Sequence, residues 1–150
     1  MLNKLATQQS KPTEKTLSLC HRLLNYAAIY PNVLLRFHAS NMILSINSSD
    51  AAYLVAPKAY GRVAGHFTLG INPSSPSGHT LVECKTLWRV VASSAEAEVA
   101  GVFHNAQVAI PIRYIVTAIG HPQPPTPIKT DNRPVVPFAN NNITQTFQVL

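Results

Sequence analysis

The stretch SAEAEVAGVF, residues Ser94 to Phe103, marks the change from strand-like to helical sequence. Ser93 and Glu96 have the Ser-x-x-Glu spacing of a capping box, and an apolar run follows them. Pro111 is expected to kink or end the regular part of this helix. Apolar residues at helical period predict its buried face: Val99, Val102, Phe103, Ala106 and Ile110.

The same stretch places two acidic residues close together, Glu96 and Glu98, in a chain that has only six. Residues two apart on a helix point about 200° apart, so the two side chains cannot face one site. Periodicity alone does not choose between them, because neither lies at the centre of the apolar stripe. The capping role of Glu96 favours Glu98 as the acid that faces a site.

Upstream of this helix the sequence predicts strands. MILSINSSDAAYL (42–54) alternates apolar and polar positions, and Asp50 is expected where this strand ends. Residues 62–70 form a second candidate strand, and the Pro- and Ser-rich segment 71–78 a loop. Residues 79–92 indicate a third strand or a strand pair, with Glu83 on a solvent face. This order is typical of an antiparallel meander.

The two ends of the chain show weaker patterns. Residues 1–13 are expected to be a flexible polar tail, and residues 13–31 a helix that ends at Pro31. NVLLRFHAS (32–40) is interpreted as a short strand. Downstream of the central helix, HPQPPTP (121–127) predicts a stiff, extended linker.

PIKTDN (127–132) then indicates a further short strand, which ends in Asp131. Strands, a helix and a strand follow one another along the chain, and this order predicts an α/β fold. The expected sheet is mixed, with an antiparallel meander followed by a parallel strand and with helices packed on it.

Three of the six acidic residues are accounted for by their local positions: Glu14 at a helix start, Glu83 in a strand and Glu96 in a cap. Asp50, Glu98 and Asp131 remain, and each is expected at a strand end or in the first helical turns. Converging carboxylates are tolerable if cations lie among them, and hard oxygen ligands select Mg²⁺ or Mn²⁺. The alternative from spacing alone is that each is an ordinary cap or loop residue.

Composition excludes several classes of protein. Cys20 and Cys84 form no CxxC pair, and the six histidines show no zinc-ligand spacing. The N-terminus lacks the apolar core of a signal peptide, and no apolar segment is long enough to span a bilayer. A cytoplasmic or nuclear protein that is neither secreted nor membrane-bound is therefore expected. The net charge of +6 suits a polyanionic partner, although the basic residues are scattered.

Three segments in one order resemble the end of a copia-type LTR retrotransposon polyprotein. The first is EKTLSLCHRLLNYAAIYPNVLLRFHASNMILSINSSDAAYLVAPKAYGRVAGHF, which contains the SDAAYL motif. The second is ECKTLWRVVASSAEAEVAGVFHNAQVAIPIRYIVTAIGHPQPPTPIKTDN, and the third is FANNNITQ. The resemblance covers roughly residues 14 to 145, nearly the whole chain.

The resemblance implies a ribonuclease H-like fold that uses two Mg²⁺ or Mn²⁺ ions to cut the RNA strand of RNA–DNA hybrids, with no small-molecule cofactor. Asp50 then matches the first catalytic aspartate, Glu98 the helix glutamate and Asp131 the aspartate that ends the parallel strand. Residues 14–40 are expected to be a remnant of the reverse transcriptase connection region. Residues 41–145 would form the ribonuclease H-like domain and 146–150 a divergent tail.

The chain departs from the family at its C-terminus. The family carries a fourth acid and further helices after the TDN motif, whereas this chain ends at Leu150. We therefore expect a C-terminally truncated domain with weakened catalysis, whose uncovered surface includes Phe138 and Ile143. The alternatives are a non-catalytic remnant that binds nucleic acid, a remnant without function, and a small protein-interaction domain.

Contact with nucleic acid is expected from basic residues that flank the meander. They are Lys58, Arg62, Lys85 and Arg89, and the alternative for each is an ordinary solvated base. Asn105 and Asn132 are polar residues near the expected site, and Asn132 is equally compatible with a turn.

Overall fold

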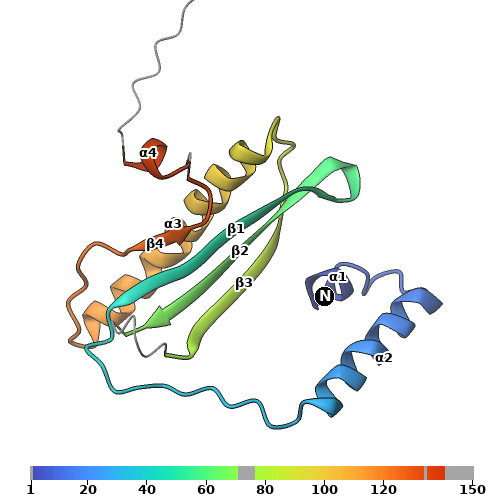
Figure 1. Cartoon of the computed structure of the whole chain (residues 1–150), viewed down its shortest axis with the longest axis horizontal. Helices are drawn as coiled ribbons and strands as arrows, with labels where there is room; N and C mark the ends of the chain where they lie inside the picture. Colours follow the sequence, from blue (N-terminus) through green and yellow to red (C-terminus); the bar gives the residue numbers. More distant parts are fainter. Residues whose placement is uncertain (1, 71–76, 134, 141–150) are drawn as a thin grey trace, which may run out of the picture. The chain divides into compact units, whose positions relative to one another are not determined.

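The structure is a computed structural model that describes residues 2–70, 77–133 and 135–140 (Figure 1). Most of the loop expected at 71–78, together with Ile143 and the tail at 146–150, lies outside these described residues. The chain divides into two compact units, residues 1–35 and 36–150. Sequence analysis places the equivalent boundary after residue 40.

The first unit holds two helices, α1 (Leu2–Ala6) and α2 (Glu14–Ile29). A capping box begins α2, because the Thr13 side chain accepts from Thr16 N and Thr16 Oγ1 accepts from Thr13 N. The Thr16 hydroxyl also donates to Gln8 Oε1 at 3.0 Å. Part of the segment predicted as a tail is thus helical and is followed by residues that hydrogen-bond to α2.

The second unit is an α/β structure built on a mixed four-stranded sheet in the order β3-β2-β1-β4. The first three strands form the predicted antiparallel meander, and β4 pairs in parallel with β1. Helix α3 connects β3 at one edge with β4 at the other, and Figure 1 shows it along one face of the sheet. The elements are β1 (Leu44–Ala56), η1 (Pro57–Ala59), β2 (Tyr60–Leu69), β3 (His79–Leu87), α3 (Ser94–Ala118), β4 (Ile128–Thr130) and α4 (Val135–Ala139).

Alternation along β2 determines which face of the sheet receives α3. Val63, Gly65 and Phe67 are buried, and the residues between them are only partly buried. Successive side chains of a strand point to opposite faces, so these three share the face under the helix. The core lies there, where Leu44, Ile46 and Phe67 pack with Ala109 of α3.

The buried face of α3 differs from the prediction. Phe103 and Ile110 are 60% and 51% exposed, although both belong to the predicted apolar stripe. Three of the residues that are buried instead are Ala or Gly, and the full set is Ala97, Glu98, Gly101, Asn105, Ala109 and Val116. Small side chains let the helix backbone lie close to the sheet, whereas the bulkier stripe would hold it away.

Two further expectations are wrong, and a third had two alternatives, of which one is confirmed. Residues 32–40 form no strand, because Arg36 O accepts one backbone bond from Gly78 N and no ladder forms among the described residues. Helix α3 does not end at Pro111 but continues to Ala118. Of the two alternatives for residues 79–92, a third strand or a strand pair, the single strand is confirmed, and β3 ends at Leu87.

Candidate metal centre

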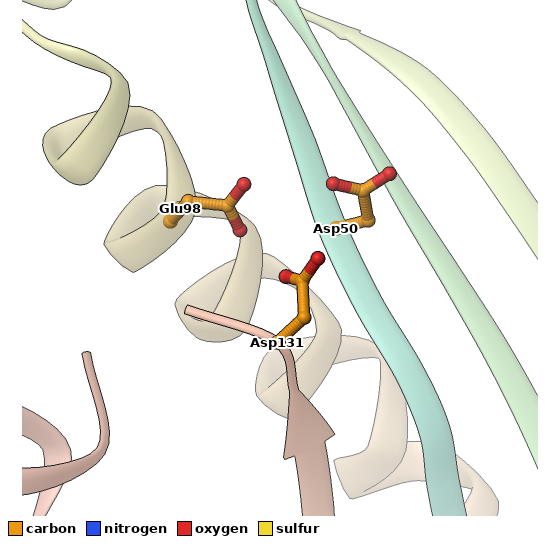
Figure 2. A group of neighbouring side chains, drawn as sticks. All are labelled: Asp50, Glu98 and Asp131. Carbon is orange, nitrogen blue, oxygen red and sulfur yellow. The ribbon is translucent and has the colours of Figure 1, made fainter. Parts of the chain in front are cut away.

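Three carboxylates from three parts of the chain meet where β4 ends beside β1 (Figure 2). Asp50 lies on β1, Glu98 on α3 and Asp131 directly after β4. One carboxylate oxygen from each lies within 4.8 Å of the others. The predicted convergence is confirmed, and the arrangement is a group that can hold a metal ion.

The parallel pairing of β1 and β4 brings the two aspartates together. Ser49 pairs with Thr130 in the parallel register, so Asp50 is the next residue of β1 and Asp131 the first residue after β4. Because parallel strands run in the same direction, both aspartates leave the ladder at the same end. The sequence predicted that the strand ends at Asp50, and this prediction is wrong. β1 continues to Ala56 by pairing with β2.

The connection before β4 is held to α3 by one arginine. The Arg113 guanidinium donates to Gln123 O at 2.9 Å, to Thr126 Oγ1 at 2.6 Å and to Pro124 O. Gln123 in turn accepts from Leu44 N at 2.8 Å, which fixes the connection to the start of β1. Residues 121–127 lack regular structure, and these bonds determine where β4 begins.

Helix α3 presents Glu98 to the aspartates through a close approach to β1. A Cβ atom at Gly101 would lie 3.4 Å from Ala51 Cβ and 3.5 Å from Asp50 O, so the helix backbone touches the strand here. Three residues earlier, Glu98 Oε1 accepts a hydrogen bond from Ala51 N at 3.3 Å. Residues three apart share a helix face, so one contact positions the other.

Glu96 takes the role that the sequence gave it, with one difference in the partner. Its backbone N–H donates to Ser93 Oγ at 3.1 Å, which is the expected N-cap bond. Its carboxylate accepts from Ala92 N at 2.7 Å rather than from Ser93 N. Glu96 is exposed and points away from the cluster, whereas Glu98 is 8% exposed.

The electrostatics of the cluster are unfavourable without a cation. Burial raises the pKa of Glu98, and the charges of Asp50 and Asp131 raise it further, against the lowering effect of the Ala51 N–H bond. Glu98 Oε2 is buried and has no hydrogen-bond partner among the residues that the structure describes. A buried, unpartnered carboxylate oxygen beside two other carboxylates fits a site for a hard divalent cation.

A pocket of about 300 Å³ adjoins the two aspartates. Apart from these two aspartates, none of its lining residues was predicted from the sequence. Exposed Lys129 of β4 contributes the positive charge in its wall. The spacing of Lys129, two residues before Asp131, was the available signal. The lining residues are Asn47, Ser49, Asp50, Lys129, Thr130 and Asp131.

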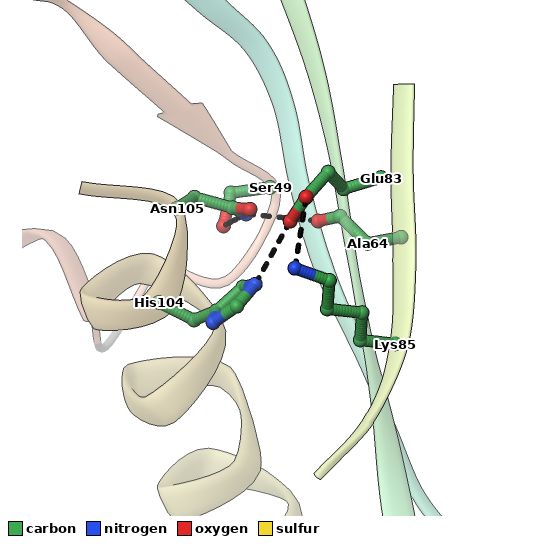
Figure 3. A network of polar contacts seen from close by, with 6 residues as sticks. All are labelled: Ser49, Ala64, Glu83, Lys85, His104 and Asn105. Carbon is green, nitrogen blue, oxygen red and sulfur yellow. Dashed lines mark hydrogen bonds and ion pairs between the residues drawn. The ribbon is translucent and has the colours of Figure 1, made fainter. Parts of the chain in front are cut away.

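Asn105 is fully buried between α3 and the sheet (Figure 3). Its Nδ2 donates to Ser49 Oγ and to Ala64 O, each at 2.9 Å. A Cβ at Gly65 would lie 2.3 Å from Asn105 Oδ1, so only glycine fits beneath this side chain. The sequence placed Asn105 near the site but gave no sign that it joins the helix to two strands.

The sequence predicted Glu83 on a solvent face, and this prediction is wrong. Figure 3 shows it under α3, where His104 Nε2 lies 3.0 Å and Lys85 Nζ 2.9 Å from its carboxylate. Burial alone raises the pKa of Glu83, but the hydrogen bonds and charges of Lys85 and His104 outweigh this effect and lower it. The group joins edge strand β3 to the helix.

The four basic residues predicted to contact phosphates do not share one face. Lys85 pairs in register with Val63 on the helix side, whereas Arg62 is the residue before Val63 in β2 and points to the other side. Lys58 lies in η1 at the turn of the hairpin, and exposed Arg89 follows β3. Their contact with nucleic acid stays a prediction.

Asn132 follows the cluster directly. Its backbone N–H donates to Thr130 Oγ1 at 3.3 Å, which is a local turn contact.

Among the helices that the structure describes, none combines the length and the apolar character needed to cross a membrane. Comparison with protein-family models, with curated proteins and with solved structures gave no match.

Proposed function

We propose that this chain is a ribonuclease H-like domain of a copia-type retroelement, which hydrolyses the RNA strand of RNA–DNA hybrids. The observation that carries the proposal is the meeting of Asp50, Glu98 and Asp131 within 4.8 Å. The mixed sheet, with its meander, crossover helix and parallel fourth strand, supports the same fold assignment.

The three carboxylates would hold the divalent cations, with Glu98 as the buried ligand and the aspartates facing solvent. Bound Mg²⁺ or Mn²⁺ ions would supply activation of a water and stabilisation of the charge of the phosphodiester. The Ala51 N–H keeps Glu98 oriented, and the close approach at Gly101 keeps its carboxylate beside Asp50. The exposed aspartates leave the solvent side open to a backbone phosphate.

Substrate binding would depend on shape and phosphate contacts, because hybrids are recognised by groove geometry and the 2′-hydroxyl rather than by base sequence. Lys129 lines the pocket beside Asp50 and Asp131 and is the basic residue nearest this role. Lys58, Arg62, Lys85 and Arg89 do not line this pocket and would contact the duplex elsewhere, with Lys85 and Arg62 on opposite sides of the sheet.

The experiment incubates the full chain with an RNA–DNA hybrid labelled on the RNA strand, with Mg²⁺ or with EDTA. We expect RNA cleavage that requires Mg²⁺ and falls more than about a hundredfold in Asp50→Asn and Asp131→Asn, because each removes a direct ligand. Glu96→Gln is the matched control, since it changes an exposed acid two residues from Glu98. A folded wild-type chain that leaves the RNA intact would contradict the nuclease proposal.

The second candidate is a non-catalytic module that binds nucleic acid. The net charge of +6 favours it, because polyanion binding needs no complete catalytic centre. It predicts binding to hybrid or duplex that weakens steeply with salt, without turnover and without effect of Asp131→Asn. Electrophoretic mobility shift at several salt concentrations, on the same samples, separates the two candidates.

A further inference from the structure

Asn105 is an unusual residue for the position that it occupies. The face of α3 that packs on the sheet carries Ala97, Gly101 and Ala109 at spacings of four residues, and Asn105 completes that row. Its side chain is 0% exposed. A buried amide is unfavourable unless it is hydrogen-bonded, whereas another alanine here would carry no such cost. Packing alone therefore does not explain an asparagine at this position.

The two hydrogen bonds of Asn105 Nδ2 end at the two residues next to Asp50, one along β1 and one across on β2. Ser49, which accepts one bond, is the residue before Asp50 on β1. Ala64, whose carbonyl accepts the other, is the cross-strand partner of Asp50 on β2. A single amide thus links α3 to both strands at the level of Asp50.

Glu98 lies on the same helix face as Asn105, because seven residues are close to two full turns, about 10 Å along the axis. Rows of small apolar side chains leave a helix able to slide or turn on a sheet, since they make few directional contacts. The Nδ2 bonds are directional and fix the axial position and rotation of α3. Gly65 reinforces this position, because the Asn105 amide lies against it.

The tolerance of a divalent-metal site makes this position matter. Mg²⁺ demands near-ideal geometry, and ligand distances must hold to about 0.2 Å, whereas one residue of helix rise is about 1.5 Å. A small shift of α3 would separate Glu98 from Asp50 and Asp131 without unfolding the core.

We propose that Asn105 is a positioning residue for the metal centre: through Ser49 and Ala64 it sets the place of α3, and so of Glu98, relative to Asp50. This inference rests on the proposed function, because it presupposes that the three carboxylates bind a cation. The helix-to-strand contact between His104 and Glu83 is the natural comparison, since it joins α3 to β3, which carries no ligand.

The test measures the dissociation constant of Mn²⁺, the probe, for the full chain by electron paramagnetic resonance of free Mn²⁺. Asn105→Leu keeps the branched shape and removes both donors, and we expect it to weaken Mn²⁺ binding about tenfold. Ser49→Ala keeps Asn105 and removes one acceptor, so it weakens binding in the same direction by a smaller factor. The double variant is expected to fall short of the product of the two single effects.

The control is His104→Gln, which is expected to lower resistance to urea and to leave the Mn²⁺ constant unchanged. A purely structural role for Asn105 would make it behave in the same way. Asn105→Leu that binds Mn²⁺ as wild type does would overturn the inference. If Asn105→Leu does not fold, an unchanged constant in Ser49→Ala overturns it instead.

Failure of the proposed metal site has a different signature. In that case the folded wild type binds no Mn²⁺, or Asp131→Asn binds it as well as wild type does. Either result overturns both the metal site and the inference built on it. Wild-type binding that is lost in Asp131→Asn and retained in Asn105→Leu overturns the inference about Asn105 alone.

Discussion

At the scale of single residues, Glu98 is held in an environment that disfavours its charge. Glu98→Gln removes that charge and keeps the size of the side chain. We expect the variant to be more stable than wild type in EDTA, because repulsion from Asp50 and Asp131 is relieved. It should also bind Mn²⁺ more than about tenfold more weakly. Urea unfolding in EDTA and Mn²⁺ titration measure the two effects, and Glu96→Gln should change neither.

The same carboxyl predicts how the stability of the metal-free protein depends on pH. The pKa of Glu98 is raised in the folded state above its ordinary value of 4.5, so the folded state takes up this proton first as the pH falls. The contribution of Glu98 to stability is therefore complete below pH 4.5 and is lost as the pH rises through the raised value.

The carboxyl of Glu83 changes the stability with pH in the opposite direction, and over a lower pH range. Its pKa is lowered, so its contribution is present above 4.5 and is lost as the pH falls through the lowered value. Urea midpoints in EDTA should thus increase as the pH falls towards 4.5. Glu98→Gln should abolish that increase, and an unchanged slope in this variant would count against the raised pKa.

The residues of the cluster could be predicted because the signals that mark them are local in the sequence. A carboxylate directly after an apolar strand, as at Asp131, is visible in the sequence, and the cap at Ser93 separates Glu96 from Glu98. The environment of Glu83 was not visible, because its partner His104 lies on another element, 21 residues away. The network around Asn105 was hidden for the same reason, since its bonds span 56 and 41 residues.

At the scale of elements, two glycines make opposite predictions for the packing of α3. At Gly101 an added Cβ finds contacts of 3.4 Å or longer, so Gly101→Ala should raise stability by up to about 1 kcal/mol through helix propensity. At Gly65 the Cβ would lie 2.3 Å from Asn105 Oδ1, so Gly65→Ala should cost about 1–3 kcal/mol.

Urea unfolding of both variants in EDTA measures the difference. Gly101→Leu extends the comparison, because its larger side chain must push α3 away from β1 and should weaken Mn²⁺ binding. Equal stability of Gly65→Ala and wild type would show that α3 adjusts easily on the sheet.

The wrong face predicted for α3 has an element-scale explanation. Helical period is satisfied both by the bulky residues Val102 and Phe103 and by the small residues Gly101 and Asn105. Hydrophobicity favours the bulky set, but the close approach of α3 to the sheet selects the small one. Pro111 misled for a related reason, since tertiary contacts such as those of Arg113 support the helix beyond it.

At the scale of the whole molecule, the second unit combines a small core with an apolar face of α3 that the described residues leave exposed. That face consists of Phe103, Ile110 and Tyr114, which are 51% to 75% exposed. Phe103→Ala should change stability by less than about 0.5 kcal/mol, because little burial is lost. Phe67→Ala, the same chemical change at a fully buried position, should cost about 3–5 kcal/mol.

Urea unfolding at several protein concentrations measures both variants. A loss in Phe103→Ala as large as that in Phe67→Ala would mean that another surface covers this face of α3 in solution. A loss that grows with protein concentration would identify that surface as a second copy of the chain.

The bonds of Arg113 hold the segment before β4, but they do not reach β4 itself. A strand of three residues has too few ladder bonds to hold its own place, so β4 should open locally far more often than β2. Each such opening withdraws Asp131 while the rest of the sheet stays folded. Deuterium uptake at residues 128–130 would then report how often the third carboxylate is present, and a bound cation would slow that uptake before any change in melting became visible.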